Sequence, residues 1–164
     1  MIVLGIDPGI ATTGCAIIGD EAGGQKLLYA EAIKTAPGNT QAKRLTLIFD
    51  RLKALIGKYK PAEAALENLF FNSNAKTALI VGQARGIIQL AFYQYKINIT
   101  EYTPLQVKMA ITGYGRADKN QIQQMVKNIL KLPEILRPDD VADAAAIALT
   151  HCFSYKMTQN IKSL

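Results

Sequence analysis

The first 35 residues contain three short apolar segments in a row, and this order restricts the fold more than any other feature of the chain. Each segment is rich in the β-branched and aliphatic residues of buried strands. Turn residues separate them, first Pro8 and Gly9 and then the glycine-containing segment 20–25. We therefore predict an antiparallel meander of three strands over residues 1–6, 12–19 and 26–35.

Helical and strand patterns alternate in the rest of the chain. Helices are predicted over 40–59, 74–94, 104–111, 119–131 and from about Pro138 to about Tyr155. Strands are predicted over 62–70 and 97–102. Three strands followed by this alternation indicate an α/β protein with a mixed five-stranded sheet flanked by helices. We expect one domain over residues 1–157 and a frayed polar tail over 158–164.

The chain is basic, because 19 Lys and Arg residues against 13 Asp and Glu residues give a formal net charge of +6. This charge suits a polyanionic partner such as nucleic acid, and it is equally consistent with a surface that only keeps the protein in solution. No apolar run approaches the ~18 residues of a membrane span, so no membrane partner is expected. Cys15 and Cys152 both lie in apolar surroundings. We expect them to be buried and reduced, which indicates a cytoplasmic protein.

Four carboxylates stand where a purely structural role is difficult to assign. Asp7 ends a strand that is otherwise apolar, and Glu67 ends the fourth strand. Asp140 and Asp143 lie near the start of the last helix, where residues three apart share one face. The rest of that helix is apolar all round, so we expect it to be buried and Asp143 to need a partner or a cation. In such sheets, sites form at the carboxyl ends of the strands.

Each acid also has a structural alternative. Asp139 and Asp140 could cap the last helix, Asp7 could be a turn residue, and Glu67 could be a solvated strand end. Four oxygen donors brought together suit Mg²⁺ or Mn²⁺. Zinc is not expected, because His151 and the two cysteines show no zinc-ligand spacing. His151, near the predicted end of a helix, is more typical of a core or dipole-compensating residue than of a general base.

Four segments together resemble the RuvC family of Holliday-junction resolvases: GIDPGIATTGCAII, LENLFFNSNAKTALIVGQARG, PLQVKMAITGYGRADKNQIQQMV and DDVADAAAIALTHC. Their order and spacing also match, and the resemblance covers nearly the whole chain. It implies a ribonuclease-H-like fold, a homodimer and Mg²⁺-dependent cutting of four-way DNA junctions in recombination and repair. The family's metal-binding acids fall on Asp7, Glu67, Asp140 and Asp143, where the Asp-x-x-Asp-Ala spacing selects Asp140 rather than Asp139.

This resemblance implies phosphodiester hydrolysis assisted by two Mg²⁺ ions, for which Mn²⁺ could substitute. Asp7 would bridge the ions, and the other three acids would complete their coordination. Two ions about 4 Å apart can activate a water and neutralise charge on the phosphoryl oxygens during an in-line displacement. The expected result on a junction is a pair of symmetric nicks with 5′-phosphate and 3′-hydroxyl ends.

The same resemblance implies DNA-binding roles for further residues. Lys108 and Lys119 fall where the family places basic residues near the scissile phosphate, although both could be solvated surface lysines. Phe70 matches an aromatic residue that stacks on unpaired bases near the crossover, a contact of about 1–3 kcal/mol per base; a place in the core is the alternative. Tyr114 and Arg116 lie in a glycine-flanked loop that could also reach DNA.

Gly82 and Gly86, in the long predicted helix 74–94, allow another backbone to approach closely. The resemblance implies that this helix pairs with its copy in a homodimer, and packing against the sheet is the alternative. Two symmetric nicks need two active sites, which favours a two-fold dimer. Family members also cooperate with the RuvA–RuvB branch-migration complex, but no residue in this sequence identifies that contact.

Other classes of protein share parts of this pattern. An actin-like or sugar-kinase ATPase also has an aspartate at a strand end before a glycine turn, but it needs two related domains, and 164 residues provide one. A non-catalytic nucleic-acid-binding module would be expected to lack some of the acids. A ribonuclease-H-like nuclease that acts on RNA is the alternative that the sequence excludes least.

Overall fold

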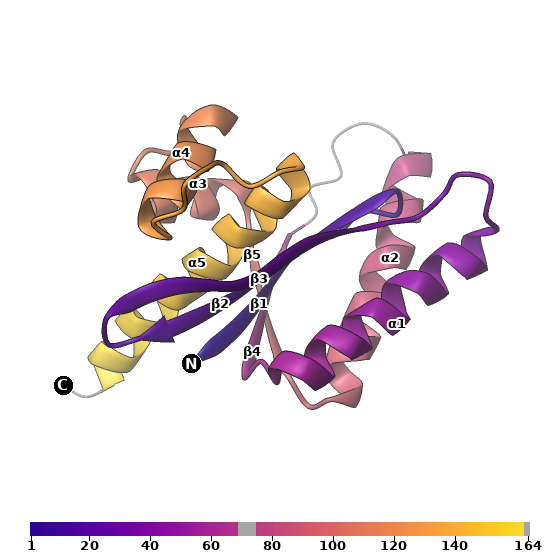
Figure 1. Ribbon diagram of the computed structural model, residues 1–164, viewed down its shortest axis with the longest axis horizontal. Coiled ribbons are helices and arrows are strands. Elements are labelled where there is room, and N and C mark those ends of the chain that lie inside the picture. The colour runs from indigo at the N-terminus through magenta and orange to yellow at the C-terminus, as the bar shows by residue number, and fades with distance from the viewer. Residues whose placement is uncertain (69–74, 163–164) are drawn as a thin grey trace.

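The computed structural model describes residues 1–68 and 75–162, which form a five-stranded sheet with helices on both faces (Figure 1). The sheet order is β3-β2-β1-β4-β5. Its strands are β1 (Ile2–Asp7), β2 (Thr12–Glu21), β3 (Gly24–Lys34), β4 (Glu63–Glu67) and β5 (Asn98–Tyr102). β1, β2 and β3 pair antiparallel, whereas β4 pairs parallel with both β1 and β5. The predicted mixed sheet with an antiparallel start is therefore confirmed.

The described helices form two layers. They are α1 (Gln41–Tyr59), α2 (Ala75–Gln94), α3 (Pro104–Thr112), α4 (Lys119–Ile129) and α5 (Asp139–Lys162). One apolar core joins α1 and α2 to one face of the sheet, and a second joins α5 to the opposite face, with α3 and α4 stacked outside α5 (Figure 1). No helix in the described part of the chain combines the length and the apolar character needed to cross a membrane.

Local capping signals explain where the short helices begin. The Thr103 side chain accepts a hydrogen bond from the Gln106 N–H, and the Gln106 side chain accepts one from the Thr103 N–H, which completes a capping box before α3. Asp118 and Gln121 form the same box before α4. Gly113, with φ at 71°, ends α3 in the left-handed conformation that glycine adopts without strain. Lys119 is thereby fixed as the first residue of α4.

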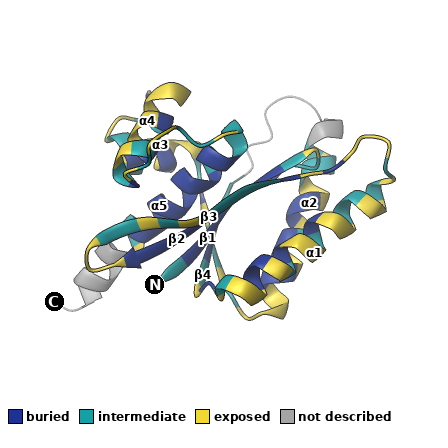
Figure 2. Ribbon diagram, in the orientation of Figure 1, coloured by how far each residue is buried: buried dark blue, intermediate teal, exposed yellow. Residues whose placement is uncertain are grey.

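Helix α5 is buried from Val141 to Cys152, with Asp143 as the exception (Figure 2). Every residue from Ala144 to Cys152 is at most 3% exposed, because the helix lies between the sheet and the α3–α4 layer. Two strand glycines allow this close contact. A Cβ atom at Gly5 would lie 2.2 Å from the carbonyl oxygen of Ala144, and one at Gly14 would lie 1.9 Å from that of Asp140. The backbone of α5 therefore rests directly on β1 and β2.

Two element boundaries differ from the prediction by more than two residues. Helix α5 continues to Lys162 instead of ending near Tyr155, so residues 158–162, expected to fray, are helical. No glycine or proline interrupts the sequence there, and nothing local stops the helix. Strand β4 spans only Glu63–Glu67 of the predicted 62–70. His151 consequently lies in the middle of α5, as a core residue and not as a helix-end residue.

Candidate active site

The folded sheet brings the predicted acids to one place. β1 and β4 are parallel neighbours whose pairing ends at Ile6 and Leu66, so Asp7 and Glu67 leave the same edge side by side. Gly14 of β2 lies opposite Asp7 in the antiparallel register. Because the carbonyl group of Asp140 rests on Gly14, the first turn of α5 is held beside Asp7.

The electrostatics of Asp7 confirm that the acids are close. Burial raises the pKa of Asp7 from 3.8 to about 7, and the charges of Glu67, Asp143 and Asp140 add to this increase. The pKa of Glu67 is also raised, first by burial and then by Asp143, while Arg85 and Lys119 oppose the change. Carboxylates that raise each other's pKa in this way have more negative charge than their surroundings compensate.

Lys119 is the cation that faces these acids. Its Nζ atom lies 3.0 Å from Oδ2 of Asp143 and 3.4 Å from Oδ2 of Asp139. We predicted that Asp143 would need a partner, and Lys119 is that partner. The Asp143 side chain is nevertheless 34% exposed, contrary to the expectation of full burial, because it stands in the first turn of α5, before the sheet and the α3–α4 layer enclose the helix. Burial raises the pKa of Asp143, against the opposing effect of Lys119.

Asp139 has a different environment from its neighbour Asp140. The Asp139 carboxylate accepts hydrogen bonds from Gln123 at 3.0 Å and from Arg137 at 2.6 Å. The hydrogen bond from Gln123, with Lys119 and Arg137 nearby, lowers the pKa of Asp139 against the opposing effect of desolvation. Asp139 therefore links α4 to the start of α5 through Gln123. It also stands in the first turn of α5, where the helix dipole favours negative charge.

The side chains as positioned do not yet form a metal cage. In the described ranges, no three His, Cys, Asp or Glu side chains converge closely enough to hold one ion. The ammonium group of Lys119, paired with Asp143, supplies positive charge at this edge of the sheet. The donors are all carboxylate oxygens, which is the ligand chemistry of Mg²⁺ and Mn²⁺.

The residues expected to contact DNA lie in several environments. Lys108 is partly buried in α3, and among the described side chains no hydrogen bond or ion pair joins it to the acids. Tyr114 is 55% exposed and lines a shallow hollow between α3 and α4, and Arg116 is exposed in the same loop. Phe70 lies outside the described residues.

Gly82 and Gly86 lie on the outer side of α2. A Cβ atom added at either position would meet nothing within 4 Å. The opposite side of α2 is the one that packs on the sheet, through Ala84, Ile88 and Phe92. The alternative that these glycines pack against the sheet is therefore wrong.

Sequence reasoning missed Gly5 and Gly14, although glycine in a strand interior often marks close approach of another backbone. It predicted correctly that both cysteines are buried. Cys15 and Cys152 form no disulfide with each other, and the buried His151 places Nδ1 3.0 Å from the hydroxyl oxygen of Tyr102. Burial lowers the pKa of His151, against the opposing charge of Glu63.

A β3-β2-β1-β4-β5 sheet with acids at the ends of β1 and β4 and at the start of α5 defines a nuclease of the ribonuclease-H-like fold. Residues 3–151 match the family described as crossover junction endodeoxyribonuclease RuvC. The chain therefore belongs to the RuvC family. Nucleases of this family are metal-dependent.

Individual relatives agree with this assignment. The RuvC crossover junction endodeoxyribonuclease of Rubrobacter xylanophilus is 50% identical over 159 residues, which cover 96% of this chain and 88% of that protein. Thermus thermophilus RuvC, solved in complex with a Holliday junction substrate, superposes with a TM-score of 0.92 at 37% identity, covering 96% of each chain. The yeast mitochondrial Holliday junction resolvase Ydc2 shares the fold at 16% identity, with a TM-score of 0.69 over 97% of this chain and 82% of that one.

Proposed function

We propose that this chain cuts four-way DNA junctions by paired symmetric nicks, in homologous recombination and DNA repair. The observation that carries the proposal is that Asp7, Glu67, Asp140 and Asp143 lie within electrostatic reach of one another where β1, β4 and α5 meet. Membership of a family of junction endonucleases supplies the class of substrate. The expected ends are a 5′-phosphate and a 3′-hydroxyl.

These four acids are the proposed ligands of two Mg²⁺ ions, which Mn²⁺ can replace. Their hard oxygen donors suit these ions. Burial raises the pKa of Asp7, and the charges of Glu67, Asp143 and Asp140 add to this increase, so a cation bound there would stabilise the carboxylate form. When bound, such ions supply an activated water and neutralise charge on the phosphoryl oxygens. Asp7 and Glu67 stand at strand ends, and Asp140 and Asp143 in the first turn of a helix packed on the sheet, so regular elements carry the backbone of all four proposed ligands.

Lys119 and Lys108 are proposed to act next to the acids. Lys119 pairs with Asp143, and with a cation bound to the carboxylates its ammonium group would be available to a phosphate. Lys108 belongs to α3, the neighbouring helix of the same layer, and Lys119 begins α4. Both would bind phosphate oxygens near the scissile bond, where an ammonium group acts as a point charge.

The exposed α3–α4 loop is a proposed DNA contact. Tyr114 offers an exposed aromatic ring and Arg116 a guanidinium group, which together suit base stacking and phosphate binding. Phe70 is proposed to stack on bases near the crossover by family resemblance. The net charge of +6 supports binding to a polyanion.

The outer side of α2 is the proposed dimer contact. It exposes a stripe at helical spacing in which Leu79 is 67% exposed, Leu90 46% and Tyr93 81%, with Gly82 and Gly86 between them. Exposed apolar residues beside glycines suit close packing against a second copy of the same helix. Gly86→Leu should make the protein monomeric in analytical ultracentrifugation, and it should then release nicked circles from a cruciform plasmid. A wild-type protein that is monomeric both free and on a junction would overturn this part of the proposal.

Two further assignments rest on resemblance and composition. The RuvA–RuvB branch-migration complex is a proposed partner because the family cooperates with it. The cytoplasm is the proposed compartment, in agreement with two buried cysteines that form no disulfide with each other.

The decisive experiment compares three labelled substrates, a four-way junction, a linear duplex and an RNA–DNA hybrid, each with Mg²⁺ and with EDTA. We expect metal-dependent symmetric cutting of the junction alone. Cutting of the hybrid in preference to the junction would favour the RNA-directed alternative. Junction binding without cutting in any divalent metal would favour the non-catalytic alternative.

A further inference from the structure

Arg85 of α2 is a buried cation at the edge of the active site. Arg85 is only 8% exposed and lies on the side of α2 that faces the sheet. One guanidinium nitrogen donates a hydrogen bond to the backbone carbonyl of Glu67, and another lies 2.5 Å from Oε1 of Glu101 in β5. Gln89, one turn further along α2, donates to the same Glu101 oxygen at 3.3 Å.

The bond from Arg85 falls where the sheet stops holding β4. Pairing with β1 ends at Leu66, one residue before Glu67. On the other side, the Asn68 N–H still donates to the carbonyl of Tyr102 at 2.8 Å. Arg85 thus binds the carbonyl group of the last strand residue, whose side chain points to the acid cluster.

A buried arginine at this position costs free energy that an apolar residue would not cost. A buried guanidinium loses its hydration, and an apolar residue of similar volume would fill the same space without that loss. The charge also reaches the side chain of Glu67, because Arg85 opposes the rise in its pKa caused by burial and by Asp143. Arg85 therefore acts on Glu67 in two ways, by its hydrogen bond to the backbone carbonyl and by its charge near the side chain.

We propose that Arg85, held by Glu101, is a positioning residue that fixes Glu67 in the orientation needed to bind the catalytic metal. This inference rests on the proposed role of Glu67 as a metal ligand. Residues that orient metal ligands from behind typically change metal affinity by about 10–100-fold when replaced.

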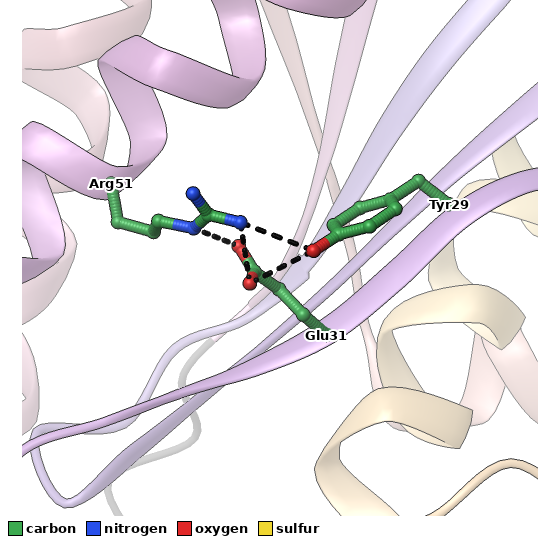
Figure 3. Close-up of polar contacts among 3 residues, drawn as sticks. All are labelled: Tyr29, Glu31 and Arg51. Carbon is green, nitrogen blue, oxygen red and sulfur yellow. Dashed lines mark hydrogen bonds and ion pairs between the residues drawn. The ribbon is translucent and has the colours of Figure 1, made fainter.

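The test compares Arg85→Met with Arg85→Lys, which keeps the charge but loses the planar fork that binds two partners at once. The matched control is Arg51→Met. Arg51 of α1 is more exposed than Arg85, but it also binds a carboxylate of the sheet, Glu31, at 2.6 and 2.9 Å, and donates to the hydroxyl of Tyr29 at 3.1 Å (Figure 3). These contacts do not involve any of the four acids.

The primary measurement is Mn²⁺ binding to each protein, followed by electron paramagnetic resonance. Thermal unfolding in EDTA, junction affinity in Ca²⁺ and single-turnover cutting against Mg²⁺ concentration accompany it. We expect Arg85→Met to weaken Mn²⁺ binding by about 10-fold or more, to raise the Mg²⁺ concentration needed for cutting, and to leave junction affinity unchanged. Arg85→Lys should recover part of the metal affinity, and Arg51→Met should bind Mn²⁺ like wild type.

A folded Arg85→Met protein that binds Mn²⁺ like wild type would overturn the inference, as would an equal loss in Arg51→Met. If Arg85→Met does not fold, Mn²⁺ binding is measured on Arg85→Lys and Glu101→Gln instead, and wild-type affinity in both would overturn the inference. Failure of the underlying function looks different. In that case wild type itself would not bind Mn²⁺, or Glu67→Gln would bind it as tightly as wild type does.

Discussion

Replacing Gly14 with alanine should stop cutting by moving acids that the substitution does not touch. The new Cβ atom would lie 1.9 Å from the carbonyl oxygen of Asp140, whereas ordinary contact begins near 3.4 Å, so the two backbones must separate by about 1.5 Å. That movement takes Asp140 and Asp143 away from the acids on β1 and β4. Misplacing a catalytic group by about 1 Å can cost about 100-fold in rate, and overpacking a core costs about 1–3 kcal/mol of stability. We therefore expect Gly14→Ala to cut at least about 100-fold more slowly than wild type.

The assay is single-turnover cutting of a labelled junction at saturating Mg²⁺, with thermal unfolding measured on the same samples. Gly19→Ala is the matched control, because it changes the same strand but its Cβ atom meets only the flexible end of Leu28, at 3.3 Å. It should cut like wild type. Our account of how α5 positions its acids would be refuted if Gly14→Ala folded and cut within a few-fold of wild type, or if Gly19→Ala were equally impaired.

Three further predictions concern the charged residues of the site. Changing any of the four acids to its amide should abolish cutting and preserve junction binding in a gel-shift assay, because no positive charge is lost, whereas Asp139→Asn should still cut. Burial and neighbouring acids raise the pKa of Asp7 from 3.8 to about 7, so the folded state holds a proton that the unfolded state releases. The metal-free protein should therefore lose stability as pH rises from about 4 to about 7, and Asp7→Asn should stabilise it in EDTA at pH 8 but hardly at pH 4; equal stabilisation at both would contradict this sign. Lys108→Ala and Lys119→Ala should slow single-turnover cutting more than they weaken binding, and a loss of affinity alone would make them general phosphate contacts.

Most secondary structure could be predicted because its signals are local. The β1–β2–β3 meander follows from apolar runs separated by turn residues, and the capping residues Thr103 and Asp118 stand directly before α3 and α4. The end of α5 was predicted wrongly, because composition was used there in place of a local stop signal. The polar composition after Tyr155 suggested fraying, but the chain contains no residue there that breaks a helix.

The sequence by itself singled out the four acids as candidates, since a carboxylate that ends an apolar strand or begins an apolar helix is conspicuous without any coordinates. Only the tertiary structure decided how they are held. Lys119 meets Asp143, and Arg85 meets the carbonyl of Glu67, across gaps of many residues in the chain. Gly14 matters only because α5 lies on β2 at that point. Such contacts depend on how layers pack, and the alternation of apolar and polar residues specifies which face is buried but not which residues on two packed faces come to lie opposite each other.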